Sequence, residues 1–169
     1  MDTEPVPVEP RVWEAITLKE AVDILIMEDP RFTGFARFIV NIRFFWSTMI
    51  STACAGDGFI FFNPLFYEQL PVESRKTVIA HEIWHLILKH LERGEGYDPL
   101  THNIAADHVI NISLEDDGFT FEDAHPTLDR KYSGMSTEQI YDVIWKKRAD
   151  EPPVPGPGFV GPEAIKKQI

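Results

Sequence analysis

Apolar residues recur every three or four positions along several stretches of the chain, which is the spacing of one face of an α-helix. The first stretch runs from Thr17 to Glu28, and its apolar residues are Leu18, Val22, Leu25 and Ile26. Thr17 has a side chain suited to capping a helix N-terminus, and Pro30 marks the end of the helix. The pattern therefore predicts a helix over 17–28.

Similar spacing predicts further helices over residues 65–69, 71–93, 99–114 and 136–148. Gly94 and Gly96 end the helix that begins near Pro71. Ser136 and Gln139 fit a capping box at the start of the last helix, in which each side chain bonds to the backbone of the other residue. Residues 152–158 are rich in proline and glycine, so we expect no regular structure there.

Apolar and polar residues alternate over residues 35–46, and a period of two is typical of a half-buried strand. Asp57 and Gly58 have the composition of a tight turn and lie between two further short segments that could pair as strands. These elements predict an α+β fold. In it, a small antiparallel or mixed sheet packs on the helix over 71–93 and on the following helix over 99–114.

Length and composition favour one domain. The chain has 169 residues, of which 44% are hydrophobic, and this is enough for one core. We divide it into an extended arm over 1–12, the domain itself over 13–148, and a tail or linker rich in proline and glycine over 149–169. Cys54 is the one cysteine, so no internal disulfide can form. With no secretory signal at the N-terminus, a cytoplasmic location is expected.

Charge narrows the range of partners. Sixteen basic and twenty-seven acidic residues give a formal net charge of −11, which would repel a phosphate backbone, so no nucleic-acid partner is expected. The apolar stretch over 35–50 contains Arg37, Asn41 and Arg43 and is too polar to span a bilayer, so no membrane partner is expected either.

A His-Glu-x-x-His motif lies within the predicted helix over 71–93. His81 and His85 are four residues apart, so both imidazoles project from nearly the same face and could bind one metal ion. Glu82 lies about 100° further round the helix, beside the site of a metal-bound water. Zinc lowers the pKa of such a water towards ~7, and a carboxylate can then act as general base. The motif therefore predicts a site for one Zn²⁺ ion with Glu82 as its base.

A catalytic zinc site commonly has three protein ligands, so a third is needed. Asp107 is our choice, because a carboxylate among small and apolar residues of the next helix is hard to explain as a solvated group. Asn103 and Asn111 share its helical face and could orient the carboxylate from outside the ligand set. His108 is the alternative ligand and otherwise a neighbour of the site. Alternatively, Asp107 only orients a histidine ligand.

The remaining histidines have weaker claims on the site. His90 is five residues beyond His85 and should point away from it in a continuous helix, and His102 lies near a helix start, so we interpret both as structural or surface residues. His125 and Tyr132 lie in a predicted loop and are candidates for stabilising a developing oxyanion.

Four segments in this order and spacing resemble a family of zinc metallopeptidase domains found in bacterial and phage proteins, often N-terminal to a von Willebrand factor A-like domain. The segments are residues 55–64, 80–85, 103–111 and 134–141, and the resemblance covers about residues 20–148. It implies a zincin-like α+β fold, with His81 and His85 as zinc ligands, Glu82 as base and Asp107 as third ligand. If the protein is phage-encoded, the expected location becomes the host cytoplasm.

The leading hypothesis is therefore a zinc-dependent metallopeptidase that hydrolyses peptide bonds in a peptide or protein held extended along a sheet edge. The alternative is a metal-stabilised protein-binding module with weak or no catalysis. A third hypothesis is latency, in which the tail after Glu151 occupies the cleft.

Overall fold

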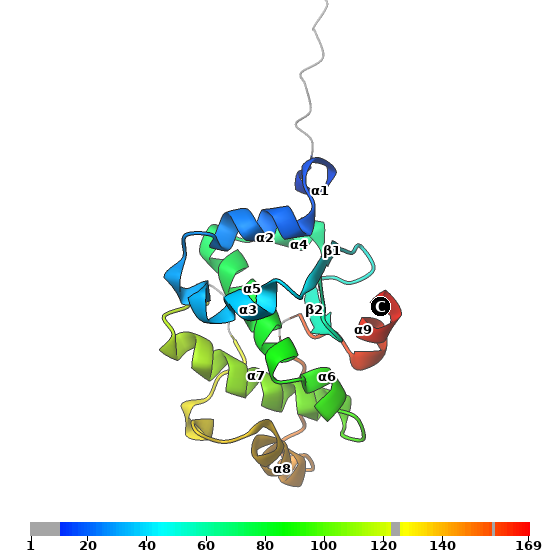
Figure 1. The fold of residues 1–169 in the computed structure, drawn as a ribbon. Helices are drawn as coiled ribbons and strands as arrows, with labels where there is room; N and C mark the ends of the chain where they lie inside the picture. The colour runs from blue at the N-terminus through cyan, green and yellow to red at the C-terminus, as the bar shows by residue number, and fades with distance from the viewer. Residues whose placement is uncertain (1–10, 123–125, 157) are drawn as a thin grey trace, which may run out of the picture.

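The computed structural model describes residues 11–122, 126–156 and 158–169, which form a mixed α+β structure (Figure 1). The strands are β1 (Arg43–Trp46), β2 (Ala53–Gly56) and β3 (Phe59–Phe62). The helices are α1 (Val12–Ala15), α2 (Leu18–Ile26), α3 (Ala36–Ile39), α4 (Pro64–Gln69), α5 (Val72–Ile87), α6 (His90–Arg93), α7 (Pro99–Asp116), α8 (Thr137–Lys147) and α9 (Pro162–Gln168). Two 3-10 helices are η1 (Pro30–Phe35) and η2 (Arg130–Tyr132).

The three strands form a mixed sheet in the order β1-β3-β2. β1 runs parallel to β3, with Arg43 opposite Phe59, and β2 runs antiparallel to it, with Ala53 opposite Phe62. Asp57 and Gly58 connect β2 to β3 with φ angles of 50° and 81°. Positive φ at both central residues is typical of a two-residue hairpin with a type I′ turn, so the predicted turn is confirmed.

The core lies between the sheet, α2, α5 and α7. Ile79 and Ile83 of α5 are fully buried in one cluster with Ile60 and Phe62 of β3, and the same cluster includes Leu114 of α7. A second cluster joins α7 to α8 and consists of Ala105, Ile112, Tyr132, Ile140 and Tyr141. One face of α7 therefore packs towards α5 and another towards α8, which fixes α7 beside the motif-bearing helix.

The strand predicted over 35–46 is wrong for residues 35–42, which form the end of η1, the helix α3 and a turn. The buried residues of this region are Phe32, Phe35, Ile39 and Ile42, and they are three or four positions apart. Phe38 and Val40, which the alternation would bury, are 41% and 76% exposed. The helical period among the larger apolar residues therefore decides the structure, and only residues 43–46 form a strand.

The helix predicted over 71–93 is interrupted. α5 ends at Ile87, and Lys89 takes the left-handed conformation with φ 52° and ψ 43° before α6 begins at His90. The prediction of one continuous helix is wrong at this point, and the direction of His90 changes as a result.

The helix caps are confirmed. Thr17 caps α2 in a capping box with Glu20, and Ser136 caps α8 in a capping box with Gln139. The short helix α4 and the long helix α7 also form close to their predicted bounds.

The tail lies on the domain. Residues 152–156 have no regular structure, as predicted, but the helix α9 was not predicted. Val160 and Ile165 pack on a small cluster of Ile50, Cys54 and Phe61, and Figure 1 shows α9 beside β2. The Thr52 hydroxyl also donates a hydrogen bond to the carbonyl oxygen of Gly158 at 2.9 Å. The division of the chain at residue 148 stays a prediction.

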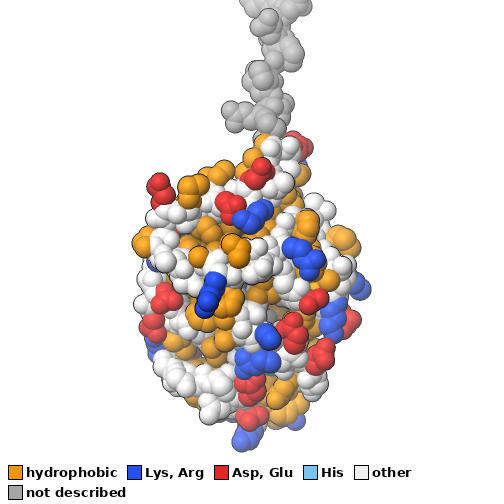
Figure 2. All heavy atoms as spheres, in the orientation of Figure 1, with side chains coloured by type: hydrophobic (Ala, Val, Ile, Leu, Met, Phe, Trp, Pro, Cys, Tyr) orange, Lys and Arg blue, Asp and Glu red, His pale blue; other side chains and the backbone are white. Residues whose placement is uncertain are grey.

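The surface in Figure 2 has acidic and basic side chains interspersed around hydrophobic ones. In the described part of the chain, the structure has no helix that is both long and apolar enough to cross a membrane.

Candidate metal centre

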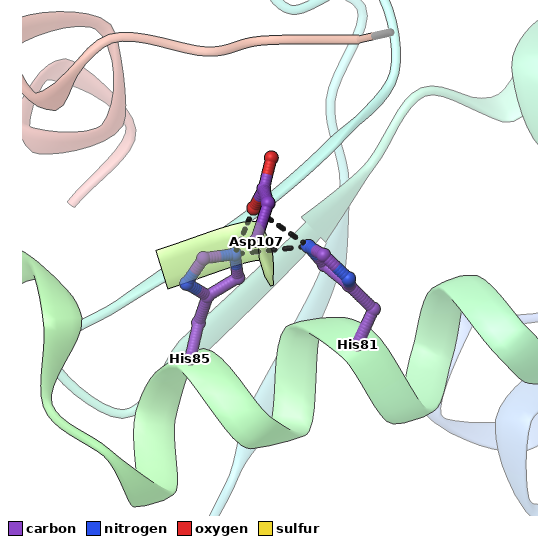
Figure 3. Close-up of side chains that lie close together, drawn as sticks. All are labelled: His81, His85 and Asp107. Carbon is purple, nitrogen blue, oxygen red and sulfur yellow. Dashed lines mark hydrogen bonds and ion pairs between the residues drawn. The ribbon is translucent and has the colours of Figure 1, made fainter. Parts of the chain in front are cut away.

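Two helices bring the predicted ligands together. On α5, Ala80 and Ile83 are fully buried in the core. His81 and His85 lie one turn apart on a different face, and Figure 3 shows both imidazoles pointing towards Asp107 of α7. The packing of α7 on α5 therefore completes a group that the motif alone cannot form.

The potential ligand atoms converge closely. His81 Nε2 lies 3.0 Å from His85 Nε2, and Asp107 Oδ1 lies 3.2 Å from the first and 3.4 Å from the second. Ligand atoms bound at 2.0–2.2 Å to a tetrahedral zinc ion are about 3.3 Å apart. The group therefore offers three ligand atoms with the separation that a single zinc ion needs.

One buried atom of the group lacks a hydrogen bond. Asp107 Oδ1 is inaccessible to solvent and has no hydrogen-bond partner among the residues that the structure describes. A buried carboxylate oxygen without a partner is costly, and a bound cation would satisfy it. Both the chemical type of the three ligand atoms and the distances between them are therefore suited to a metal ion.

The imidazole tautomers follow from the partners of Nδ1. Asn111 Nδ2 donates to the carbonyl oxygen of Thr127 at 3.1 Å, which identifies the other side-chain atom of Asn111 as the amide oxygen. That oxygen lies 2.8 Å from His81 Nδ1 and can only accept. His81 Nδ1 therefore carries a hydrogen, and its Nε2 faces the centre of the group, where it can bind either a proton or a metal ion.

Electrostatics couple the two kinds of ligand. Burial acts to lower the pKa of His81, but the nearby carboxylate of Asp107 outweighs it and raises that pKa to about 9. Burial acts to raise the pKa of Asp107, and the two histidines outweigh it and hold that pKa well below its usual range. The carboxylate is therefore ionised and attracts positive charge to this point, whether a proton or a metal ion.

Glu82 lies in the wall of the same cavity. Its residue surface is 7% exposed, and burial raises its pKa above the ordinary value. Cys54 of β2 is buried nearby, where burial and then the charge of Glu82 raise the pKa of its thiol to about 12. Such a thiol is a poor nucleophile.

The two asparagines contact different ligands. Asn103 Nδ2 donates to Asp107 Oδ2 at 3.1 Å, and its expected role in orienting the carboxylate stays a prediction. Asn111 was predicted to do the same, but it accepts from His81 instead, because the turn of α7 that carries it packs beside His81.

His108 lies apart from the three-atom group. Its Nδ1 accepts a hydrogen bond from the backbone of Asp129 at 3.1 Å, and its ring packs against Tyr132 with centroids 4.7 Å apart. Tyr132 is buried between α7 and α8 and is not among the described residues that line the cavity. His125, the other oxyanion candidate, lies outside the described residues.

The cavity beside the ligands has a volume of about 400 Å³. Residues 52–55, which include all but the last residue of β2, line this cavity, and so do Gly158, Phe159 and Val160 of the tail. A Cβ at Gly156 would lie 2.6 Å from Thr127 Oγ1 and 3.6 Å from Asp107 Oδ2. The backbone of the tail therefore passes directly beside the ligand group.

His90 is the functional candidate that sequence reasoning missed. It is 5% exposed, and its Nδ1 lies 3.1 Å from His85 Nδ1. Burial, followed by the charges of His85 and His102, lowers the pKa of His90 to about 2, so this imidazole is neutral. In the continuous helix predicted over 71–93, His90 points away from His85. The contact between the two rings could have been predicted only if the break at Lys89 had been known.

Comparisons with curated proteins and with solved structures found no match. A comparison with protein families found a match over residues 14–164, which is most of the chain. This match is consistent with the His81, His85 and Asp107 group. The protein therefore belongs to the family described as "Putative metallopeptidase domain".

Proposed function

We propose that the protein is a zinc-dependent peptidase in which His81, His85 and Asp107 bind the ion and Glu82 is the general base. The observation that carries the proposal is the convergence of three ligand atoms, 3.0 to 3.4 Å apart, in a cavity that Glu82 also lines. Membership of a metallopeptidase family supports it independently.

Each residue has a distinct role. His81 and His85 contribute neutral nitrogens, and Asp107 contributes a negative charge that strengthens cation binding. When bound, zinc lowers the pKa of a coordinated water and polarises a carbonyl group. Glu82 accepts a proton from the attacking water and delivers it to the departing amine, and burial raises the pKa of its carboxylate, which makes it a stronger base.

The edge of the sheet supports a peptide as substrate. β2 lies at one end of the strand order, and residues 52–55 line the cavity beside the ligands. An extended peptide can bind such an edge through its backbone, which needs no particular side chains. An unfolded protein chain is therefore the substrate class that we propose.

The test compares the wild type with Glu82→Gln on an unfolded protein substrate, with zinc content measured in both. We expect the variant to retain zinc and to lose about 10²- to 10⁴-fold in turnover, because the amide cannot accept the proton. Glu92→Gln on the exposed face of α6 is the matched control and should cleave like the wild type.

Equal cleavage by the wild type and Glu82→Gln would show that the hydrolase proposal is wrong. Zinc binding without cleavage by either protein would instead favour the metal-stabilised binding module, in which the same ligands serve stability alone.

A further inference from the structure

The chain changes direction between α5 and α6, and this brings a second buried histidine against a predicted ligand. In a continuous helix, His85 and His90 would lie about 140° apart around the axis. Lys89 instead takes a left-handed conformation, which residues with a Cβ adopt rarely. His90 consequently packs on His85, with ring centroids 5.1 Å apart.

The hydrogen bonds of His90 form a chain with one consistent direction. His85 Nε2 faces the ligand group, so as a ligand it has its hydrogen on Nδ1. His90 Nδ1, 3.1 Å away, must then accept that hydrogen, which leaves the hydrogen of His90 on Nε2. His90 Nε2 lies 2.9 Å from the hydroxyl oxygen of Thr137, which accepts it.

Thr137 holds this series of hydrogen bonds in place. It is 2% exposed and is the first residue of α8, next to the Ser136 cap. The ring of His90 is thus held between α5 and α8, and its acceptor nitrogen cannot turn away from His85 without breaking the bond to Thr137.

We propose that His90 is a positioning residue that fixes the tautomer and ring orientation of His85, with Thr137 fixing His90 in turn. The proposal rests on the metal-binding part of the proposed function and not on hydrolysis. His85 would then have the same kind of support that Asn111 gives His81, since each predicted ligand imidazole has a buried acceptor at Nδ1. Outer partners of this kind commonly change metal affinity 10- to 100-fold when removed.

His102 provides a matched control. It is as buried as His90, and the two rings are 6.0 Å apart. Its Nε2 has no hydrogen-bond partner within the described residues, so it supplies no acceptor to His85. A substitution at His102 therefore disturbs the same region without removing the acceptor from His85.

The experiment measures the zinc dissociation constant of the full chain by competition with a chelator, together with the melting temperature of each metal-free protein. We expect His90→Phe to weaken zinc binding 10- to 100-fold and His102→Phe to change it less than threefold. His90→Asn places an amide oxygen near the position of Nδ1 and should restore most of the affinity. Cobalt spectra of the same proteins report whether the ligand geometry changes with the affinity.

Thr137→Val is the second variant, and it keeps the test decisive if His90→Phe does not fold. It removes the hydroxyl but preserves the shape, and we expect a three- to tenfold loss of zinc affinity that Thr137→Ser reverses. Zinc affinity at the wild-type level in both His90→Phe and Thr137→Val would overturn the positioning role of His90 but would leave the proposed metal centre standing. So would a loss in His90→Asn as large as in His90→Phe. A wild type that binds no zinc would overturn it together with the metal centre, whereas a wild type that binds zinc without cleaving peptides leaves it standing.

Discussion

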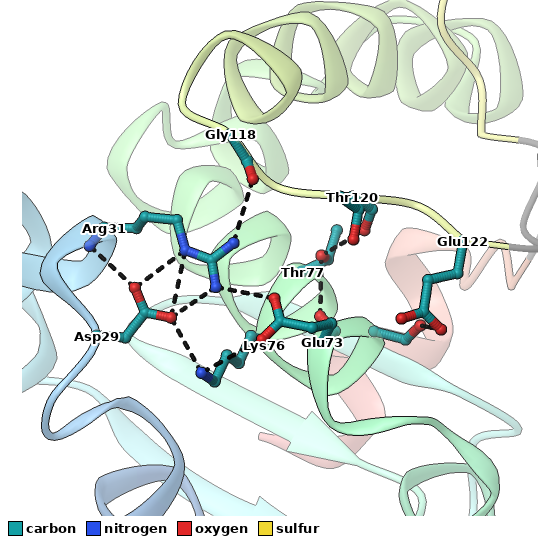
Figure 4. Close-up of polar contacts among 9 residues, drawn as sticks. Asp29, Arg31, Glu73, Lys76, Thr77, Gly118, Thr120 and Glu122 are labelled. Atoms are coloured by element: carbon teal, nitrogen blue, oxygen red, sulfur yellow. Dashed lines mark hydrogen bonds and ion pairs between the residues drawn. The ribbon is translucent and has the colours of Figure 1, made fainter.

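Asp29 lies between two basic side chains at the start of η1 (Figure 4). Its Oδ2 is 2.6 Å from the guanidinium of Arg31 and 3.1 Å from the ammonium of Lys76, and its side chain is only 7% exposed. The Arg31 hydrogen bonds outweigh the effect of burial and hold the pKa of Asp29 well below its ordinary value of 3.8. Because the depressed pKa belongs to the folded state, this charge stabilises the protein above pH 3.8.

We expect Asp29→Asn to lower the free energy of unfolding by about 1–3 kcal/mol at pH 7, because a buried charged partner of Arg31 and Lys76 is lost. Asparagine keeps the oxygen that accepts from the backbone of Arg31, so the change isolates the charge. The stabilisation is lost as pH falls from 3.8 through the folded-state pKa. Urea unfolding at pH 7 and pH 3 should therefore show the difference between the two proteins narrowing at the lower pH.

The control for this prediction is Asp23→Asn. Asp23 pairs with Lys19 on the surface of α2, where both side chains are more than 40% exposed. Such a pair contributes less than about 1 kcal/mol. A difference for Asp29→Asn that stays constant between pH 7 and pH 3 would contradict the assignment of its stabilisation to the charge.

At the residue scale, helical spacing predicted that His81 and His85 lie together, but spacing alone did not predict which residues of other helices contact them. His81 and His85 are one turn apart on any helix, so their convergence needs no tertiary information. Asp107 could be proposed because a carboxylate among apolar residues needs a partner. The contact of Asn111 with His81 depends on how α7 sits against α5, and no sequence period encodes that distance.

At the element scale, the residue that separates α5 from α6 has an unfavourable backbone conformation. Lys89 is exposed and has φ 52°, which glycine adopts without a steric penalty. We expect Lys89→Gly to raise the free energy of unfolding by about 0.5–1 kcal/mol, since relief of strain exceeds the added entropy of the unfolded chain. Chemical denaturation measures the effect.

Lys146→Gly in α8 is the matched control, because Lys146 is exposed and helical. Glycine there should lower stability by about 1 kcal/mol. If both glycine variants were destabilised equally, Lys89 would not be left-handed in solution, and α5 would continue as a straight helix.

Elements with a local start signal were predictable, whereas elements defined by packing were not. The Thr17 and Ser136 caps fix the starts of α2 and α8 through bonds within four residues. Residues 35–42 have apolar residues that satisfy both a period of two and a period near 3.6, and burial of Phe35 and Ile39 in the core selects the helical one. α9 has few apolar residues and depends on contacts of Ile165 with the face of the sheet.

At the scale of the whole molecule, the tail forms part of the cavity wall. We expect removal of residues 151–169 to increase cleavage of unfolded protein substrates per folded molecule, because Gly158, Phe159 and Val160 no longer narrow the cavity. The melting temperature should fall at the same time, since Ile50, Cys54 and Phe61 lose their cover. Cleavage rates below the melting temperature, normalised to folded protein, test this.

Ile165→Ala provides the intermediate case for the tail. It weakens the contact of α9 with the sheet but keeps the chain intact, so its cleavage rate should lie between those of the wild type and the truncated protein. Unchanged cleavage in both variants would show that the tail does not limit access to the cavity.

The proposed mechanism requires that His81, His85 and Asp107 bind one divalent cation, and the most direct test is the zinc content of the purified protein. We predict one zinc per chain in the wild type after dialysis against dilute zinc, and less than about a tenth of that in His81→Ala and Asp107→Ala under the same conditions, since loss of one of three ligands greatly weakens the site. A wild type without zinc, or full zinc content in both variants, would contradict the proposed metal centre.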